Sequence, residues 1–387
     1  MNYVYLSPHF PPNYFNFCIA LRKFGVNVLG LADAQFDQLQ TELQHGLTEY
    51  FRVEDLHNYD QLVKALGYFT FKYGKIDGID SNNEYWLETE AKLRTDFNIN
   101  GFKLDTLDAI KCKSVMKKVF QNADVPCARG NIVADIKEAK KLIGEVGYPV
   151  VAKPDKGVGA ANTFKIHNEN ELKSFFKTKP DITYIMEEFI KGDICSFDGL
   201  TDQDGNLVFF TSHQYEKGVM EVVNEDTHVY YYSYRDVPKD IEEAGRKILK
   251  AFNVKGRFFH FEFFRLHEDS KIVALEVNMR PPGGFTTDMF NWACDIDIYQ
   301  GWANVVVNNK FDADYTRRYH VCYISRKYNK HYQHDHHEIL NRFGGMIVMH
   351  KELAPVLSQA MGNYAYIVRA KTLDPIFEAI DFIHKEN

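Results

Sequence analysis

The residues best suited to chemistry fall within five positions at the end of a predicted strand, Glu276-Val277-Asn278-Met279-Arg280. Alternate side chains of a strand point to the same face, so Glu276, Asn278 and Arg280 are expected on one side. Carboxylate and amide oxygens are hard ligands that suit a magnesium ion, which also bridges phosphate oxygens. Arg280, one step beyond them, is placed to meet an anion at the edge of that metal.

A further carboxylate, Glu262, lies in the preceding predicted strand, 257–266. If the turn between the strands centres near Asp269, Glu262 lies opposite Glu276, with Cβ atoms roughly 4.5–5.5 Å apart. Two carboxylates that close repel each other unless a cation lies between them. The flanking residues are nearly all apolar, so both faces of the sheet are expected to be covered and the charges to need partners. A magnesium site is therefore favoured over two outward-facing, solvated carboxylates.

Two weaker patterns lie upstream. Lys153 begins a glycine-bearing segment, 153–162, in which small residues let backbone N–H groups approach phosphate oxygens and lysine supplies positive charge. An ordinary hairpin turn with a solvated lysine fits this segment equally well, and the P-loop pattern is absent. The predicted strand 183–188 then enters a connector whose apolar and acidic groups could hold an adenine ring; taken alone, it also fits an ordinary strand end.

These three patterns, in this order, resemble the ATP-grasp superfamily over roughly residues 1–300. The superfamily's Glu-x-Asn-x-Arg motif is intact. Lys113 stands in a segment similar to the family's Asp-Lys-x-x-Met, with Cys112 in the aspartate position. The first hundred residues look like the family's preceding α/β domain, including the segment 84–88 at its end.

The resemblance implies ATP and magnesium as cofactors. Two Mg²⁺ ions would be bound by Glu262, Glu276 and Asn278, with Mn²⁺ as an alternative metal, and Arg280 would be the catalytic residue that stabilises phosphoryl transfer. Lys113 and Lys153 would bind the phosphates of the nucleotide, and the covering loop would contain Gly157, Gly159, Ala160 and Ala161. The adenine would be held by Glu187, Glu188, Phe189 and Ile190. Asp193 would contact the ribose, since the family's usual ribose carboxylate is here Ile194.

Five residues are candidates for the substrate side of the site. Gly283 and Gly284 follow Arg280 and would let a substrate approach the backbone closely, although a plain loop fits them equally well. His213 and Gln214 lie in a strand-linked segment that could face the acceptor. Glu84 belongs to the segment that ends the N-terminal unit.

Within the superfamily, the carboxylate–amine ligase branch fits best. Such an enzyme activates a small carboxylate as an acyl phosphate, captures it with an amine and releases ADP and phosphate. One alternative is an enzyme similar to biotin carboxylase that acts on bicarbonate. The other is an ATP-binding regulatory module without turnover, against which the complete set of Glu262, Glu276, Asn278 and Arg280 argues.

These residues must be positioned by a mixed fold, an α/β and α+β chain of three units. Strands alternating with helices predict an open parallel sheet over 1–107. A two-part ATP-grasp fold with antiparallel sheets is expected to follow: a small part with the glycine loop at 108–190, and a large part with the metal site and a C-terminal extension at 191–387. Asp135 is predicted to cap a helix, 136–146, and 202–206 to form a hairpin turn. One helix is expected from 287 to 307, then a helix–strand–helix ending.

Composition narrows the class of protein. A net charge of -7 argues against a nucleic-acid partner, and no stretch of the 387 residues approaches the apolar length that spans a bilayer. No secretory signal is visible, and the six scattered cysteines predict a reduced, cytoplasmic protein without disulfides. A homodimer stays an open alternative. The histidine-rich segment 331–337 fits a polar loop or a helix N-terminus better than a metal site.

Overall fold

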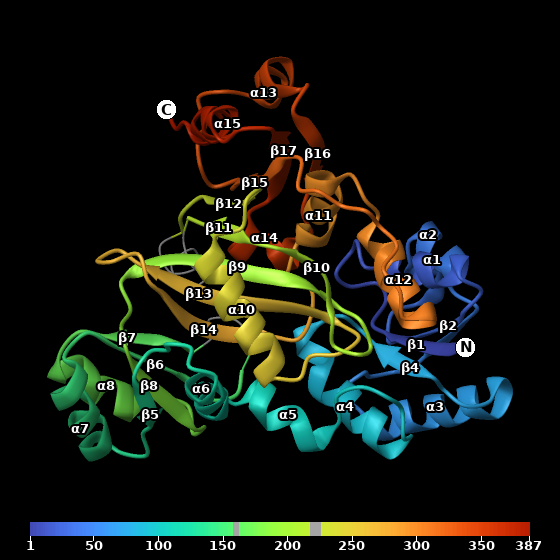
Figure 1. Ribbon diagram of the computed structural model, residues 1–387, viewed down its shortest axis with the longest axis horizontal. Coiled ribbons are helices and arrows are strands. Elements are labelled where there is room, and N and C mark those ends of the chain that lie inside the picture. Colours follow the sequence, from blue (N-terminus) through green and yellow to red (C-terminus); the bar gives the residue numbers. More distant parts are fainter. Residues whose placement is uncertain (158–161, 217–225) are drawn as a thin grey trace.

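The computed structural model describes residues 1–157, 162–216 and 226–387. Three sheets organise these residues, one parallel and two antiparallel. The predicted mixed fold class is therefore confirmed. In Figure 1 the N-terminal sheet lies at the right, a small sheet at the lower left and the large sheet between and above them.

The N-terminal sheet is parallel, with strand order β3-β2-β1-β4. The chain moves outward from β1 to β3 and returns on the other side of β1, so a topological switch point lies between β1 and β4. The elements of this unit are β1 (Asn2–Leu6), α1 (Phe15–Lys23), β2 (Asn27–Ala32), η1 (Phe36–Gln38), α2 (Thr41–Gly46), β3 (Glu49–Arg52), α3 (Tyr59–Tyr73), β4 (Gly78–Asp80), η2 (Glu84–Trp86) and α4 (Leu87–Asp96).

The small sheet is antiparallel, with strand order β5-β8-β6-β7, and two helices cover it (Figure 1). Asp135 accepts hydrogen bonds from the backbone of Lys137 and Glu138, which confirms the predicted cap. The elements are β5 (Gly130–Ile132), α7 (Ile136–Val146), β6 (Val150–Pro154), β7 (Phe164–Ile166), α8 (Glu169–Thr178) and β8 (Tyr184–Glu188).

The large sheet has nine antiparallel strands; β10 pairs with β9 beside a main path ordered β14-β13-β9-β11-β12-β15-β17-β16. The predicted turn at 202–206 joins β9 to β10 and is confirmed. The strands are β9 (Gly192–Thr201), β10 (Leu207–Thr211), β11 (His213–Tyr215), β12 (Val229–Ser233), β13 (Phe258–Leu266), β14 (Ile272–Asn278), β15 (His320–Arg326), β16 (Ile347–Glu352) and β17 (Tyr364–Ala370).

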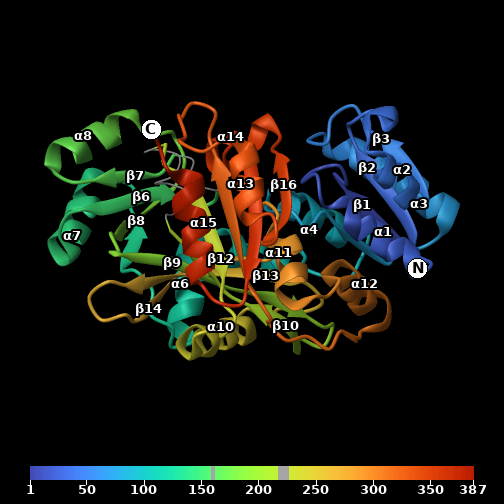
Figure 2. The same cartoon turned by 90° about the horizontal axis from the view of Figure 1, so that it is seen from above.

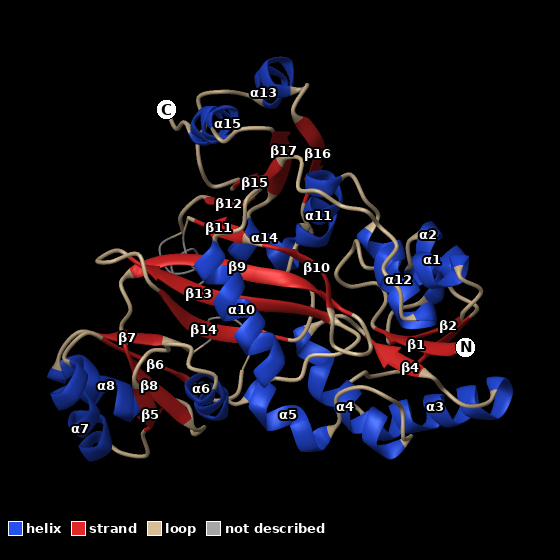
Figure 3. Cartoon of the chain, viewed as in Figure 1, coloured by secondary structure: helices blue, strands red, loops and turns tan. Residues whose placement is uncertain are grey.

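Helices pack on both faces of the large sheet (Figure 3). One face carries α5 (Leu104–Lys111), α6 (Lys113–Asn122) and α10 (Lys239–Ala251), through Met116, Phe120 and their apolar neighbours. The opposite face carries α11 (Thr286–Cys294) and α12 (Ile298–Asn308). The N-terminal unit joins this second face through Phe17 of α1, whose ring meets Phe258, Tyr299 and Trp302. This aromatic cluster ties the parallel sheet to the large one.

Two predictions about the C-terminal third were wrong. The helix expected at 287–307 is two helices, because Asp295 adopts a left-handed conformation that ends α11, and Asp297 then caps α12. The expected helix–strand–helix ending instead contains three strands that extend the large sheet (Figure 2). Its helices are α13 (His336–Phe343), η3 (Pro355–Leu357), α14 (Ser358–Met361) and α15 (Asp374–His384).

The histidine-rich segment 331–337 leads into α13. Asp335 and Glu338 form a capping box there, so the interpretation as a helix N-terminus is confirmed. Within the described ranges, no helix combines the length and the apolar character that crossing a membrane requires.

Candidate active site

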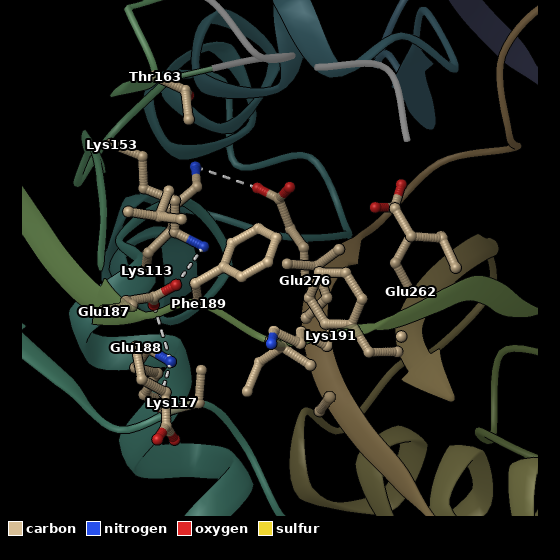
Figure 4. Close-up of a pocket in the computed structure, with 18 of the residues that line it drawn as sticks. Lys113, Lys117, Lys153, Thr163, Glu187, Glu188, Phe189, Lys191, Glu262 and Glu276 are labelled. Carbon is tan, nitrogen blue, oxygen red and sulfur yellow. Dashed lines mark hydrogen bonds and ion pairs between the residues drawn. The ribbon is translucent and has the colours of Figure 1, made fainter. Parts of the chain in front are cut away.

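A cavity of about 520 Å³ lies between the small sheet and strands β13 and β14, a size typical of sites for small molecules (Figure 4). Lysines reach it from α6 and β6, and carboxylates reach it from β13 and β14. The cavity thus has one basic wall and one acidic wall.

The acidic wall is formed by adjacent rungs of the β13–β14 ladder. Glu262 pairs directly with Glu276, as predicted, and His260 pairs with Asn278. The register shifts just after Glu262, so this part of the ladder carries an irregularity beside the cavity. Arg280 follows two residues after β14 and also lines the cavity, which brings the predicted metal ligands and the predicted catalytic arginine into one space.

The basic wall depends on a tie between α6 and the end of β6. Asp155 accepts hydrogen bonds from the backbone N and Oγ of Ser114, at 2.7 and 3.0 Å, and thereby fixes the start of α6. Lys113, the first residue of α6, consequently lies near Lys153 of β6. Lys113 Nζ is 3.1 Å from Glu276 Oε1, and it donates to the carbonyl of Gly157 at 3.4 Å. The basic wall thus touches the acidic wall directly.

Glu187 links two buried lysines in this wall (Figure 4). Its carboxylate oxygens lie 2.7 Å from Lys117 Nζ and 2.7 Å from Lys153 Nζ. Burial alone would lower the pKa of Lys153, but Glu187 and Glu276 outweigh it and raise the pKa. Burial would likewise raise the pKa of Glu187, yet the two lysines bring it below its ordinary value. Lys153 and Glu187 are therefore both charged near neutral pH.

Lys117 was missing from the sequence predictions. It lies one helical turn after Lys113, on the same face of α6, and this spacing is the signal that identifies it.

The other predicted adenine residues and the predicted ribose residue line the other end of the cavity, whereas Glu187 lies between Lys117 and Lys153. Glu188 is held by Arg129, whose backbone N and Nε donate to it at 2.7 and 2.8 Å, so its carboxylate already has partners. Phe189 lies beneath the ammonium group of Lys165, 3.8 Å from the ring centroid. Asp193 pairs with His267 at 2.9 Å.

Ile190 completes the lining at this end, while Gly159, Ala160 and Ala161 fall outside the described residues.

Arg280 also faces the N-terminal sheet. Its Nε lies 4.0 Å from Glu84 Oε2, while the other oxygen of Glu84 is paired with Lys111 at 2.8 Å. Glu84 Oε2 is buried and has no hydrogen-bond partner among the residues that the structure describes. Glu84 begins η2, which follows β4. The corner formed by Glu84 and Arg280 therefore lies at the carboxyl edge of the parallel sheet, where such sheets bind ligands.

Gly284 lies close to this corner, with a φ of +64° that favours glycine, and its carbonyl accepts from Asn13 Nδ2 at 3.4 Å. Gly283 has open space where a Cβ would stand.

None of the five predicted substrate residues, Glu84, His213, Gln214, Gly283 and Gly284, is among those that line the cavity, and two of them lie within the large sheet. His213 is fully buried in the large sheet, where its Nδ1 lies 2.7 Å from Asp198 Oδ2. Gln214 donates to the carbonyl of Ile194 at 3.1 Å and accepts from the hydroxyl of Tyr234 at 2.7 Å. Neither side chain is among those that line the cavity.

A histidine beside the acidic wall was not predicted. His260 Nε2 lies 2.9 Å from Glu262 Oε1, and its Nδ1 lies 2.5 Å from Asp198 Oδ1. Burial alone would lower the pKa of His260, but Asp198 and Glu262 raise it to about 9. Burial would raise the pKa of Glu262, whereas the hydrogen bond from His260 helps to bring it below its ordinary value. The signal in the sequence is the His-x-Glu spacing, which places both side chains on one face of β13.

The donor atoms of the acidic wall fit a magnesium ion. Glu262, Glu276 and Asn278 offer two carboxylates and an amide oxygen, all hard ligands. Over residues 1–157, 162–216 and 226–387, no three His, Cys, Asp or Glu side chains gather closely enough to hold an ion by themselves. Magnesium is usually bound by one or two carboxylates together with substrate phosphates and water.

Comparison with known proteins agrees with this geometry. Residues 146–288 match the family described as ATP-grasp domain. An L-arginine-specific L-amino acid ligase from Bacillus subtilis is 25% identical over 272 residues, which cover 68% of this chain and 65% of the relative. The carbamoyl phosphate synthase large chain of Agathobacter rectalis is 24% identical over 197 residues, 50% of this chain but only 18% of that protein. This chain thus spans under two thirds of each relative's length.

Two solved structures share the fold over almost the whole chain. An L-amino acid ligase from Bacillus licheniformis superposes with a TM-score of 0.75 and 14% identity, covering 98% of this chain and 95% of that one. N5-carboxyaminoimidazole synthetase from Staphylococcus aureus, complexed with ADP, gives a TM-score of 0.71 and 14% identity over 97% and 95% of the two chains. Residues 146–288 thus match an ATP-grasp domain, and nearly the whole chain shares its fold with these ligases.

Proposed function

We propose that this protein is an ATP- and magnesium-dependent carboxylate–amine ligase. In the proposed reaction, a carboxylate oxygen attacks the γ-phosphorus of ATP, which yields an acyl phosphate and ADP. An amine nitrogen then attacks the acyl carbon, the C–O bond to phosphate breaks, and the nitrogen loses a proton to form the amide. The products are the amide, ADP and inorganic phosphate.

The observation that carries this proposal is the meeting of two opposite walls in one cavity. Lys113 and Lys153 project from one side, Glu262, Glu276 and Asn278 from the other, and Arg280 lies beyond them. A site that only bound a nucleotide would have no need of an arginine at the far side of the metal ligands. Preorganised cations of this kind stabilise the charge that develops during phosphoryl transfer.

Each wall has its own proposed task. The two lysines bind the phosphates, and Glu187 with Lys117 keeps Lys153 in place. Glu188, Phe189 and Ile190 are proposed to bound the adenine end, where Arg129 already engages the carboxylate of Glu188. Asp193 is proposed for the ribose, and Gly157 with the residues that follow it for the covering loop.

Two magnesium ions are proposed at Glu262, Glu276 and Asn278. When bound, they would neutralise charge on the phosphate oxygens. For Glu276 to serve as a ligand, Lys113 must exchange its contact with that carboxylate for a phosphate. Arg280 then stabilises the transferring phosphoryl group from the opposite side.

The substrate side is proposed to lie at the corner of Arg280, Glu84, Gly283 and Gly284. The buried Oε2 of Glu84, which accepts no hydrogen bond from the described residues, is suited to a cationic group, and Arg280 to a carboxylate or acyl phosphate. Because one corner offers both charges, an amino acid is the substrate class that it suits, which agrees with the L-amino acid ligases among the similar proteins. His213 and Gln214 are left out of this proposal because their side chains are engaged within the large sheet, His213 with Asp198 and Gln214 with Ile194 and Tyr234.

We also propose the three units 1–107, 108–190 and 191–387 and a cytoplasmic location. Six free cysteines, all buried or half-buried, favour a reducing compartment.

A screen for substrate-dependent ADP release tests the proposal. L-amino acids are offered singly and in pairs with ATP and Mg²⁺, together with other amines, small acids and bicarbonate. ADP release that requires both a carboxylate and an amine supports the ligase. Release with bicarbonate alone would assign the protein to the carboxylating enzymes instead. Metal-dependent ATP binding without turnover on any substrate would contradict the proposal and leave a binding module.

A further inference from the structure

A chain of polar side chains runs from Glu262 into the interior of the large sheet. His260 stands two residues before Glu262 on β13, and Asp198 lies directly opposite His260 on β9. His213 of β11 follows behind Asp198. Asp198 and His213 are fully buried, and His260 is 5% exposed, so no solvent shares these contacts.

Every member of this chain has a defined partner. His260 donates from Nε2 to Glu262 Oε1 at 2.9 Å, and its Nδ1 lies 2.5 Å from Asp198 Oδ1. The other oxygen of Asp198 accepts from His213 Nδ1 at 2.7 Å and from Ser196 Oγ at 2.6 Å. Asp198 is thereby held from both sides and cannot turn away from His260.

The donors and acceptors determine which way the chain points. An ionised carboxylate only accepts hydrogen bonds, so the ring nitrogen Nε2 of His260, which lies against Glu262 Oε1, is the donor of that contact. Within the described part of the chain, Glu262 Oε2 makes no hydrogen bond, and the side chain of Glu262 remains 26% exposed at the cavity. His260 therefore occupies one oxygen of Glu262 and leaves the other free.

We propose that His260, held by Asp198, is the positioning residue that fixes Glu262 for the metal ion. The inference rests on the proposed function, since it concerns the same metal site. Groups that hydrogen-bond to a metal ligand fix its orientation, and their loss typically weakens metal binding about 10- to 100-fold. His260 faces Asn278 across the ladder, so it also completes the polar square formed with Glu262 and Glu276.

A purely structural role is the competing explanation. Apolar residues of similar volume often replace a buried ion pair without loss of stability, so stability alone gives little reason for charged groups here. The two roles differ in what they predict. A structural role changes the unfolding temperature, whereas a positioning role changes the affinity for the metal and depends on a donor at the position of Nε2.

The test measures Mn²⁺ binding by electron paramagnetic resonance in the presence of saturating adenylyl imidodiphosphate. His260→Leu removes the donor, His260→Gln retains an amide donor of similar reach, and Asp198→Asn loosens the imidazole. His320→Gln is the matched control, because His320 is a half-buried histidine of β15 that bonds only the carbonyl of Ser233 among the described residues. Nucleotide affinity in EDTA and the unfolding temperature are measured for every variant.

His260→Leu is expected to weaken Mn²⁺ binding about 10- to 100-fold, Asp198→Asn about tenfold, and His260→Gln no more than about threefold. The control and all EDTA affinities stay at the wild-type value. Equal losses in the Leu and Gln variants, or wild-type Mn²⁺ affinity in His260→Leu, would overturn the inference. If His260→Leu does not fold, wild-type Mn²⁺ affinity in Asp198→Asn overturns it. Wild-type protein that binds no Mn²⁺ with the nucleotide would overturn the proposed function, and this inference with it.

Discussion

The end of the cavity that contains the basic wall, proposed to bind the phosphates and called the phosphate end, differs from the corner formed by Glu84 and Arg280 in how its charges are paired. At the phosphate end, charges already compensate one another, as in the chain Lys117–Glu187–Lys153 and the pair Lys113–Glu276. At the corner, one buried oxygen of Glu84 accepts no hydrogen bond from the described residues and lies 4.0 Å from Arg280. A buried polar group without a partner is costly. The difference suggests that the first region is preorganised for a constant ligand, the nucleotide, and the second is completed only by a substrate.

Glu276→Gln should have the largest effect on this comparison. It removes the charge of a proposed magnesium ligand that also balances Lys113. We expect substrate-dependent ADP release to fall by about 10³-fold or more, since single groups that stabilise the transition state are worth about 10²–10³. Steady-state ADP production measures this, and nucleotide affinity in EDTA should not fall. Activity within tenfold of the wild type would remove Glu276 from the metal site.

Arg280→Lys should come next. Lysine keeps the charge but loses the planar fork that arginine offers to a phosphoryl group or a carboxylate, so we expect kcat to fall about 10²-fold. Nucleotide affinity should stay the same, because Arg280 lies beyond the metal ligands. A change in nucleotide affinity with unchanged kcat would move Arg280 from the transferring group to ground-state binding.

Lys153→Met tests the preorganised end itself. A charged hydrogen bond contributes about 1.5–3 kcal/mol, so ATP affinity should fall about 10- to 150-fold. Calorimetry with adenylyl imidodiphosphate measures it. Because Met leaves Glu187 with Lys117 alone, the double variant Lys153→Met/Glu187→Gln should recover part of any lost stability. Wild-type nucleotide affinity in Lys153→Met would contradict a phosphate contact.

Glu84→Gln should separate the two regions most cleanly. It removes the negative charge of Glu84 at the corner while leaving the phosphate end intact, so KM for the amine or amino-acid substrate should rise about tenfold with unchanged ATP affinity. Lys111, which pairs with the other oxygen, provides the control: Lys111→Met should affect stability more than ATP affinity. A Glu84 variant with altered ATP affinity and unaltered substrate KM would reverse the assignment of the two regions.

Arg129→Gln should have the smallest effect. The pair with Glu188 is exposed on the arginine side, and exposed ion pairs contribute little, so ATP affinity should change no more than about threefold. A larger loss would show that the carboxylate of Glu188 contacts the base directly.

The sequence predicted best what depends on neighbouring residues. The pairing of Glu262 with Glu276 follows from strand period and turn position, and the cap at Asp135 from local hydrogen bonding. The break at Asp295 was missed because aspartate adopts left-handed backbone only in a suitable context. The ending was predicted with one strand instead of three, and the pairing of β17 with β15 joins segments that are far apart in the sequence.

The same contrast holds within the site. The Glu-x-Asn-x-Arg motif reads directly from the chain, whereas the link from His260 to Asp198 requires β9 to lie beside β13. His213 was expected at the acceptor, but the sequence could not show that its side chain turns into the covered sheet. The corner at Glu84 depends on packing between the first hundred residues and the end of β14, contacts that no local pattern encodes.

The most direct test of the central claim follows the carboxylate oxygen. Once the ADP-release screen has identified a pair of substrates, the carboxylate is labelled with ¹⁸O and the inorganic phosphate is examined by ³¹P NMR. If the carboxylate is activated as an acyl phosphate, each inorganic phosphate released should carry one labelled oxygen, and ADP should be the nucleotide product. The Glu276→Gln variant should lose this transfer of labelled oxygen to phosphate. Label that appears in AMP, or phosphate without label, would contradict the account.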